Sequence, residues 1–162
     1  MNLKGISYRD QPIPSDVDSI RNIVRSSGFF SPEEVEMAVE LLLERFSKGE
    51  SSGYYFSFVE INERVVGYSC YGPIPCTKDS YDLYWIALLH GFRGRGIGRD
   101  LLQRAEEKIG KMGGRRIYVD TSSREQYEPT RSFYRACGYE QEAVLKDFYS
   151  PGDDKVIYVK QV

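Results

Sequence analysis

A glycine-rich segment, Arg93-Gly94-Arg95-Gly96-Ile97-Gly98, separates two stretches with different periodicity. The apolar run 83–89 before it is typical of a strand, and the apolar spacing in 101–112 after it predicts a helix. The chain therefore passes from a strand through a glycine loop into a helix. Free backbone N–H groups at a helix start, at the positive end of its dipole, favour phosphate binding. We expect Gly96 and Gly98 to allow a close backbone approach and to adopt conformations closed to other residues. Arg93, Arg95 and Arg99 would add positive charge.

Two common phosphate-binding patterns fit this segment poorly. The P-loop requires Lys-Ser or Lys-Thr after its glycines, and neither follows here. The dinucleotide fingerprint G-x-G-x-x-G opens its βαβ unit, whereas this segment reads G-x-G-x-G and more than eighty residues precede it. Asp120 lies near the distance expected of a ribose-binding acid, so a nicotinamide-dependent oxidoreductase remains an alternative. A second alternative is that the segment binds no ligand and is only a helix start whose glycines assist packing.

Composition narrows the class of protein. The 162 residues suit one domain over 1–162, and 41% hydrophobic with 28% charged residues is ordinary for a soluble chain. A net charge of −2 gives no basic field for nucleic acid, and no apolar run is long enough for a membrane span. Cys70, Cys76, Cys137 and His90 lack ligand-like spacing, so we expect no metal. Free thiols and the absence of a leader pattern predict a cytoplasmic protein.

The order of predicted elements describes a mixed sheet. Strands are expected at 6–9, 54–61, 64–71, 83–89, 116–120, 142–149 and 155–160. Helices are expected from Ser15, Ser31, Gly98 and Pro129, with Ser15 and Ser31 as N-caps. Hairpins make most of the sheet antiparallel, while the strand–helix–strand unit around the glycine loop must be parallel. The fold class is therefore α/β (α+β), a largely antiparallel central sheet with helices on both faces.

A second motif gives the chain a family resemblance. Phe133-Tyr134-Arg135-Ala136-Cys137-Gly138-Tyr139 follows the glycine loop after one helix and one strand. With Arg93-x-x-Gly96-x-Gly98, the run from Trp85 to Tyr139 resembles the core of the GNAT superfamily of N-acetyltransferases. This resemblance implies an enzyme that binds acetyl-CoA where two parallel strands, near Leu88 and Val119, splay apart.

The resemblance also assigns expected roles. Backbone groups of Ile86, Ala87 and Leu88 would pair with the pantetheine arm, and the N–H groups from Arg93 to Gly98 would hold the pyrophosphate. Tyr134 would protonate the leaving thiolate, and Asp82 falls near the position of a catalytic carboxylate in some members. Many members carry asparagine where this chain has Tyr127, so Tyr127 would contact the cofactor or shape the pocket instead.

Acetyl transfer to an amine needs a base, an oxyanion donor and an acid. Asp82, Glu60 and Asp120 are candidate bases by strand position, although each could be a solvated acid. A strand N–H near Ala87 suits the oxyanion. Tyr134 suits the acid if adjacent Phe133 points the other way and fills the core.

The acceptor is expected to be a cationic primary amine of a small molecule or peptide. It would lie between the loop with Phe29 and Phe30 and the last hairpin, which offers Asp147 and Tyr149. Asp153 and Asp154 are more typical of turn residues. A non-catalytic acyl-CoA-binding sensor is the alternative function, and either a monomer or a homodimer fits the sequence.

Overall fold

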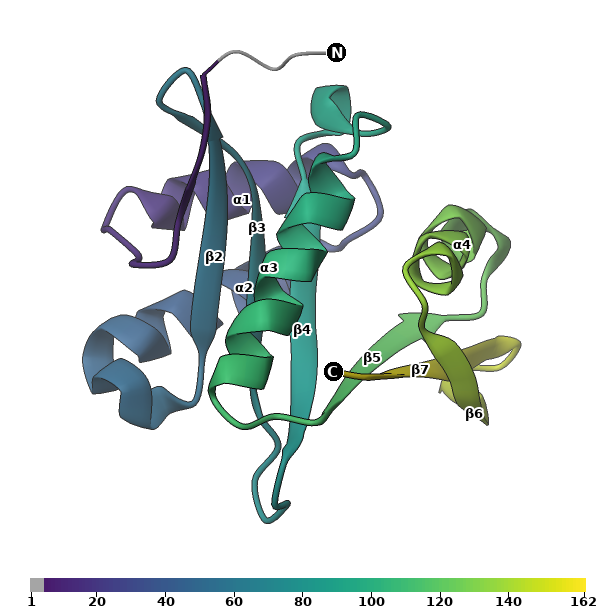
Figure 1. Ribbon diagram of the computed structural model, residues 1–162. Helices are drawn as coiled ribbons and strands as arrows, with labels where there is room; N and C mark the ends of the chain where they lie inside the picture. Colours follow the sequence, from purple (N-terminus) through teal and green to yellow (C-terminus); the bar gives the residue numbers. More distant parts are fainter. Residues whose placement is uncertain (1–4) are drawn as a thin grey trace.

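The computed structural model describes residues 5–162, which form one mixed sheet and the helices that cover it (Figure 1). The main elements, in chain order, are β1 (Ile6–Arg9), α1 (Asp16–Ser26), α2 (Pro32–Lys48), β2 (Tyr55–Ile61), β3 (Arg64–Pro73), β4 (Ser80–Leu88), α3 (Ile97–Lys111), β5 (Arg116–Ser122), α4 (Glu128–Ala136), β6 (Glu140–Ser150) and β7 (Asp153–Gln161). The sheet order is β1-β2-β3-β4-β5-β7-β6, and β4–β5 is its parallel pair. The predicted fold class is confirmed.

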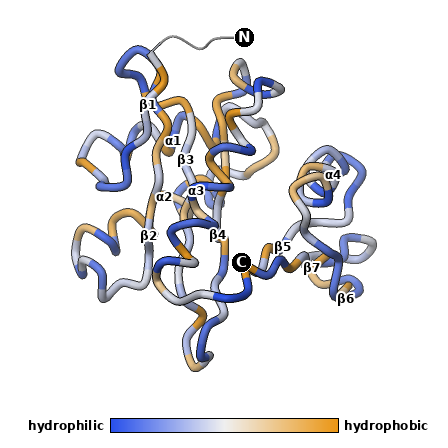
Figure 2. Tube along the Cα trace, in the orientation of Figure 1, coloured by the Kyte–Doolittle hydropathy of each residue, from blue (hydrophilic) through white to orange (hydrophobic). Residues whose placement is uncertain are grey.

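Helices cover both faces of the sheet. Ile97 and Leu101 of α3 pack with Val59 and Val66 on one face. On the other face, α1 and α2 pack on β2 and β3 through a cluster that includes Leu42. In Figure 1, α3 crosses in front of the sheet and α1 lies behind it, while α4 stands beside β5, β6 and β7. Figure 2 shows apolar and polar residues alternating along α3, as a helix with one buried side requires.

The two N-terminal helices begin differently. Ser31 accepts from the Glu34 N–H, and Glu34 accepts from the Ser31 N–H, which confirms the predicted cap of α2 as a capping box. The predicted side-chain cap by Ser15 is wrong, because Ser15 makes no capping bond. Instead the next residue, Asp16, is fully buried and accepts the Ile13 N–H at 2.7 Å. The start of α1 is therefore fixed by a buried carboxylate.

Short turns fix the register of the hairpins. Ile61 pairs with Arg64, and the two residues between them have positive φ, 51° for Asn62 and 63° for Glu63. This backbone matches the two-residue turn that follows the natural twist of a hairpin. Gly138 ends the α4 segment at φ 86°, the left-handed conformation expected after a helix. No helix within residues 5–162 is long and apolar enough to cross a membrane.

Candidate active site

Strands β4 and β5 run together for only a short distance. Their register contains three pairs, Ser80 with Arg116, Tyr81 with Ile117 and Asp82 with Tyr118. Beyond Asp82, β4 keeps its partner β3 while β5 pairs with β7. We call this opening the β4–β5 divergence. It leaves the β5-facing edge of β4 without a strand partner from Leu83 to Leu88, so backbone groups there can pair with an extended ligand.

A β-bulge in β4 lies within the divergence. Cys70 pairs with Trp85 and Tyr71 pairs with Leu83, so Tyr84 is an extra residue on β4. The bulge changes which face the following residues occupy. Leu83 packs in the cluster beneath α3, whereas Trp85, two residues later, packs with the α1–α2 side. Sequence reasoning missed the bulge, because nothing in the apolar run 83–89 marks the residue that loses its partner.

The glycine loop joins β4 to α3 at the open end of the divergence. Gly94 and Gly96 have φ values of 72° and 82°, and Gly96 is the N-cap of α3. A Cβ added at either position would meet no atom within 4 Å, so the space outside the loop is open. Among the hydrogen bonds of the described residues, none uses the N–H groups of 94–98. Open space and free donors are what a pyrophosphate requires, so the loop fits this part of CoA.

Two other features of the glycine loop bear on pyrophosphate binding. Arg93 and Arg95 are exposed, and neither forms an ion pair within the described part of the chain. A Cβ at Gly98 would lie 3.6 Å from both Leu88 Cδ1 and Phe133 Cε2. A Cβ at Gly98 would make ordinary van der Waals contact with these two side chains, and Gly98, unlike Gly96, does not have a positive φ. The predicted pyrophosphate-binding residues 93–98 follow the predicted pantetheine-binding residues 86–88 after the short segment 89–92.

Tyr134 is buried within a cluster of tyrosines. Its ring lies 5.6 Å from Tyr139 and 6.1 Å from Tyr158, and only 5% of the residue is exposed. Burial, and to a smaller extent Cys137, raises the pKa of the Tyr134 hydroxyl well above its ordinary value. Tyr134 therefore stays protonated near neutral pH. Phe133 was expected to fill the core instead, but it is less buried and lies beside Gly98.

Asp82 is a half-buried carboxylate at the start of the divergence. Burial, reinforced by Asp120 and opposed by Lys155, raises the pKa of Asp82 to about 6. It makes no hydrogen bond or ion pair with any other residue that the structure describes. Asp120 is close by but carries an ion pair, since its Oδ2 lies 2.6 Å from Lys155 Nζ. A desolvated, unpaired carboxylate can accept a proton near neutral pH, so Asp82 is the best-placed candidate base.

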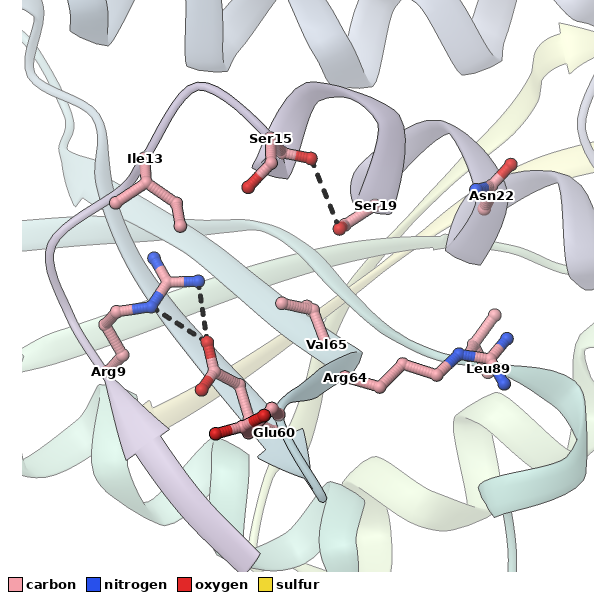
Figure 3. A pocket seen from close by; sticks show the side chains of 10 residues that line it. Arg9, Ile13, Ser15, Ser19, Asn22, Glu60, Arg64, Val65 and Leu89 are labelled. Atoms are coloured by element: carbon pink, nitrogen blue, oxygen red, sulfur yellow. Dashed lines mark hydrogen bonds and ion pairs between the residues drawn. The ribbon is translucent and has the colours of Figure 1, made fainter.

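The third candidate base lies elsewhere. Glu60 Oε1 accepts Arg9 Nε at 3.0 Å, and both side chains border a cavity of about 370 Å³ between α1 and the β1–β3 strands (Figure 3). Ser15, Ser19, Asn22, Arg64 and other residues line this cavity, which contains no residue of the glycine loop or β5. The cavity is therefore separate from the divergence, and Glu60 does not belong to the candidate active site.

Aromatic residues from three segments approach the divergence on the predicted acceptor side. Phe29 lies 5.5 Å from Tyr127, ring centre to ring centre, and Phe30 lies 5.1 Å from Trp85. Burial raises the pKa of Tyr149, and Asp120, Asp153 and Tyr127 raise it further. The loop after α1 thus meets both β4 and the segment before α4. Tyr127 contacts this aromatic group, which is consistent with shaping the pocket.

The acids Asp147, Asp153 and Asp154 of the last hairpin already have hydrogen-bond or ion-pair partners. Asp147 has φ 54°, and its Oδ1 accepts the Gly152 N–H at 2.8 Å. Asp154 accepts the Asp147 N–H, also at 2.8 Å. Asp153 accepts the Ser122 hydroxyl and pairs with Arg124 Nε at 3.1 Å. Asp147 and Asp154 thus accept backbone N–H groups around the turn. Asp153, which was expected to be a turn residue, is instead a buried residue at the start of β7 with partners on and just after β5.

Comparisons with known proteins agree with this geometry. The family model described as "Acetyltransferase (GNAT) family" matches residues 17–139. The structure resembles a solved GNAT-family protein from Desulfovibrio desulfuricans at 43% identity and TM-score 0.95, covering 97% of this chain and 99% of the other. No curated protein sequence matches the chain.

Two more distant structures share the fold. An aminoglycoside 6'-N-acetyltransferase solved with coenzyme A is 18% identical with TM-score 0.76, and 96% of each chain is covered. A GNAT acetyltransferase from Elizabethkingia anophelis with acetyl-CoA bound is 15% identical with TM-score 0.68, covering 98% of this chain and 99% of the other.

Proposed function

This chain belongs to the GNAT acetyltransferase family, and from this premise we propose that it transfers the acetyl group of acetyl-CoA to a primary amine. The observation that carries the proposal is the β4–β5 divergence, whose free β4 edge is followed by the short segment 89–92 and then by the glycine loop. An extended pantetheine arm can pair with the free β4 edge, and a pyrophosphate can bind the N–H groups of the glycine loop. Two solved proteins of the same fold hold CoA or acetyl-CoA, which supports this ligand.

Different segments of the chain bind the pyrophosphate, the pantetheine arm and the acetyl group of acetyl-CoA. The N–H groups of 94–98 bind the pyrophosphate, with Arg93 and Arg95 supplying charge. Backbone groups of Ile86, Ala87 and Leu88 pair with the pantetheine amides. An N–H near Ala87, close to the bulge at Tyr84, donates to the acetyl oxygen as negative charge develops there. Bound acetyl-CoA supplies an activated acyl group as a thioester.

Two side chains handle the protons. An alkyl amine has a pKa near ~10.4, so it must lose a proton before it can attack. Asp82 accepts this proton, directly or through water, because its pKa of about 6 leaves it ionised at neutral pH. Tyr134 donates its hydroxyl proton toward the departing sulfur, since burial keeps it protonated until then. Asp82 acts where the amine loses its positive charge, and Tyr134 acts where negative charge develops on the sulfur. Replacing either residue is therefore expected to affect turnover more than acetyl-CoA affinity.

The proposal is tested by incubating the protein with acetyl-CoA and a panel of primary amines. Release of free CoA thiol should match the formation of N-acetylated amine, measured by mass spectrometry. The competing function is an acyl-CoA sensor, which would bind acetyl-CoA without releasing thiol in the presence of any amine. A thermal shift with NAD and none with acetyl-CoA would instead favour the oxidoreductase alternative.

A further inference from the structure

We infer that Lys160 positions Tyr134 for proton donation, by tying the end of the helix that carries this tyrosine to the helix that begins at the glycine loop. The inference rests on the proposed acetyl transfer and adds a positioning residue to it. Lys160 lies on β7, where it pairs with Ile117 of β5, so its effect on the reaction passes through the residues that it holds.

The ammonium group of Lys160 joins three elements of the fold. Its Nζ donates to Glu106 Oε2 of α3 at 2.8 Å and to the carbonyl of Cys137, the C-cap of α4, at 2.9 Å. Only 27% of the Lys160 side chain and 12% of the Glu106 side chain are exposed, so salt screens this ion pair less than a surface pair. The last carbonyls of a helix lack partners within it, and a cation there is favourable. Lys160 therefore links α3, the end of α4 and β7 through one charged group.

The turn that ends α4 includes the backbone of Tyr134. The Tyr134 carbonyl accepts the N–H groups of Cys137 and Tyr139, each at 3.0 Å. Gly138 closes the turn in the left-handed conformation, with φ 86°. Cys137, whose carbonyl Lys160 holds, is thus bonded directly to Tyr134. A displacement of Cys137 would therefore move the backbone of Tyr134 as well.

Tyr139 gives the ion pair a second contact with Tyr134. The Tyr139 ring centre lies 5.6 Å from the Tyr134 ring and also 5.6 Å from Lys160 Nζ. Tyr139 is buried, and burial, followed by Glu106, raises the pKa of its hydroxyl, which indicates that this hydroxyl lies near the Glu106 carboxylate. Side chains in a close-packed interior do not shift independently, so the ion pair also restrains the Tyr134 ring.

The position of α4 relative to α3 matters for the reaction. Gly96 of the glycine loop is the N-cap of α3, and Glu106 lies further along the same helix. The contact between Glu106 and Lys160 therefore relates the proton donor on α4 to the helix whose start is proposed to bind the pyrophosphate. A misplacement of about 1 Å can lower a catalytic rate by about 10²-fold, so even a small shift of α4 should be measurable.

The test is a double-mutant cycle between Lys160 and Tyr134. Lys160→Met removes the ammonium and keeps an apolar stem, and should lower the single-turnover rate by about tenfold while the Kd of acetyl-CoA stays within about twofold. The same substitution in the Tyr134→Phe background should lower the rate by less than about twofold, because the group that Lys160 positions is already gone. Lys111→Met removes an exposed lysine of α3 and should leave the rate unchanged in both backgrounds.

Glu106→Gln provides a second variant, which keeps an oxygen acceptor for Lys160 and removes the negative charge. Its rate should lie between those of the wild type and Lys160→Met, and the difference should again disappear when Tyr134 is replaced by Phe. An equal fractional loss with and without the Tyr134 hydroxyl would overturn the inference, because a general loosening of the fold slows both backgrounds alike. Wild-type rates in both Lys160→Met and Glu106→Gln would also overturn it. Absence of turnover with every amine would instead refute the proposed function itself.

Discussion

Asp82 on β4 and Tyr118 on β5 form the last residue pair before the two parallel strands separate. The Asp82 carboxylate is half-buried here and makes no hydrogen bond or ion pair with another described residue. The bulge at Tyr84 then turns β4 away, and the strand continues into the glycine loop. A proton acceptor and an open phosphate-binding loop are thus placed along one strand.

Replacing Gly96 should abolish acetyl-CoA binding. The residue has φ 82°, and any side chain there would extend into open space beside free N–H groups. Gly96→Glu adds strain and a negative charge, and should weaken acetyl-CoA binding by far more than tenfold in isothermal titration calorimetry. Gly110→Glu is the matched control, because Gly110 lies in α3 with open space around it and no positive φ. Equal affinities in the two variants would contradict the assignment of the loop.

The hydroxyl of Tyr134 should matter for turnover rather than for binding. Tyr134→Phe keeps the ring in its tyrosine cluster and removes only the proton donor. Single-turnover rates should fall by roughly 10²–10⁴-fold, while the dissociation constant of acetyl-CoA stays within about twofold. Wild-type single-turnover rates in this variant would show that Tyr134 serves packing alone.

The pH dependence should report the ionisation of Asp82. Burial and Asp120 raise its pKa to about 6, so the basic form is lost as the pH falls through that value. The slope of log kcat/KM against pH should therefore decrease by one near pH 6 in the wild type. Asp82→Asn should lack this break and lose most of its activity at all pH values. A break near pH 6 that persists in the variant would assign it to another group.

Stability gives an independent check on Asp82. A carboxyl whose folded pKa is raised costs stability as the pH rises from its ordinary pKa to about 6, because the unfolded chain ionises more readily. Asp82→Asn removes this cost. The variant should be at least as stable as the wild type at pH 8 in urea unfolding, whereas a clear loss would mean that Asp82 makes a stabilising contact.

Asp16 should be a major determinant of stability. It is fully buried, accepts two guanidinium N–H groups of Arg9 at 2.8 Å each, and accepts the Ile13 N–H. Asp16→Ala should cost about 3–5 kcal/mol in urea unfolding, because it leaves a largely buried Arg9 short of a partner. Asp18→Ala removes a carboxylate that is 83% exposed and should cost about 0.5 kcal/mol or less. A small loss for Asp16→Ala would contradict the view that this carboxylate fixes the start of α1.

The features that could be predicted from sequence were local ones. Of the two glycines expected to adopt a conformation closed to other residues, Gly96 has a positive φ and Gly98 does not. Apolar periodicity correctly predicted a strand before the loop and a helix after it. The order of elements followed from the same periodicity, and it determined the parallel pair. These features depend on residues close to one another in the chain, so they can be predicted from a single sequence.

The features that sequence missed depend on pairing across strands. Tyr84 is a bulge only because β3 pairs with the residues on either side of it. Asp147 was expected to bind the acceptor from a strand, but its positive φ and its bond to Gly152 depend on how the hairpin closes. The ion pair between Lys155 and Asp120 likewise requires β7 to lie next to β5. Such relationships arise only once the sheet is assembled.

Hydrogen–deuterium exchange with and without acetyl-CoA tests the central claim most directly, because it locates the ligand without a chosen acceptor. The account predicts protection in peptides covering 83–98, where the free β4 edge leads into the glycine loop, and none around the separate cavity beneath α1. Protection confined to 15–22 and 60–65, with 83–98 unchanged, would contradict the assignment of the β4–β5 divergence as the acetyl-CoA site.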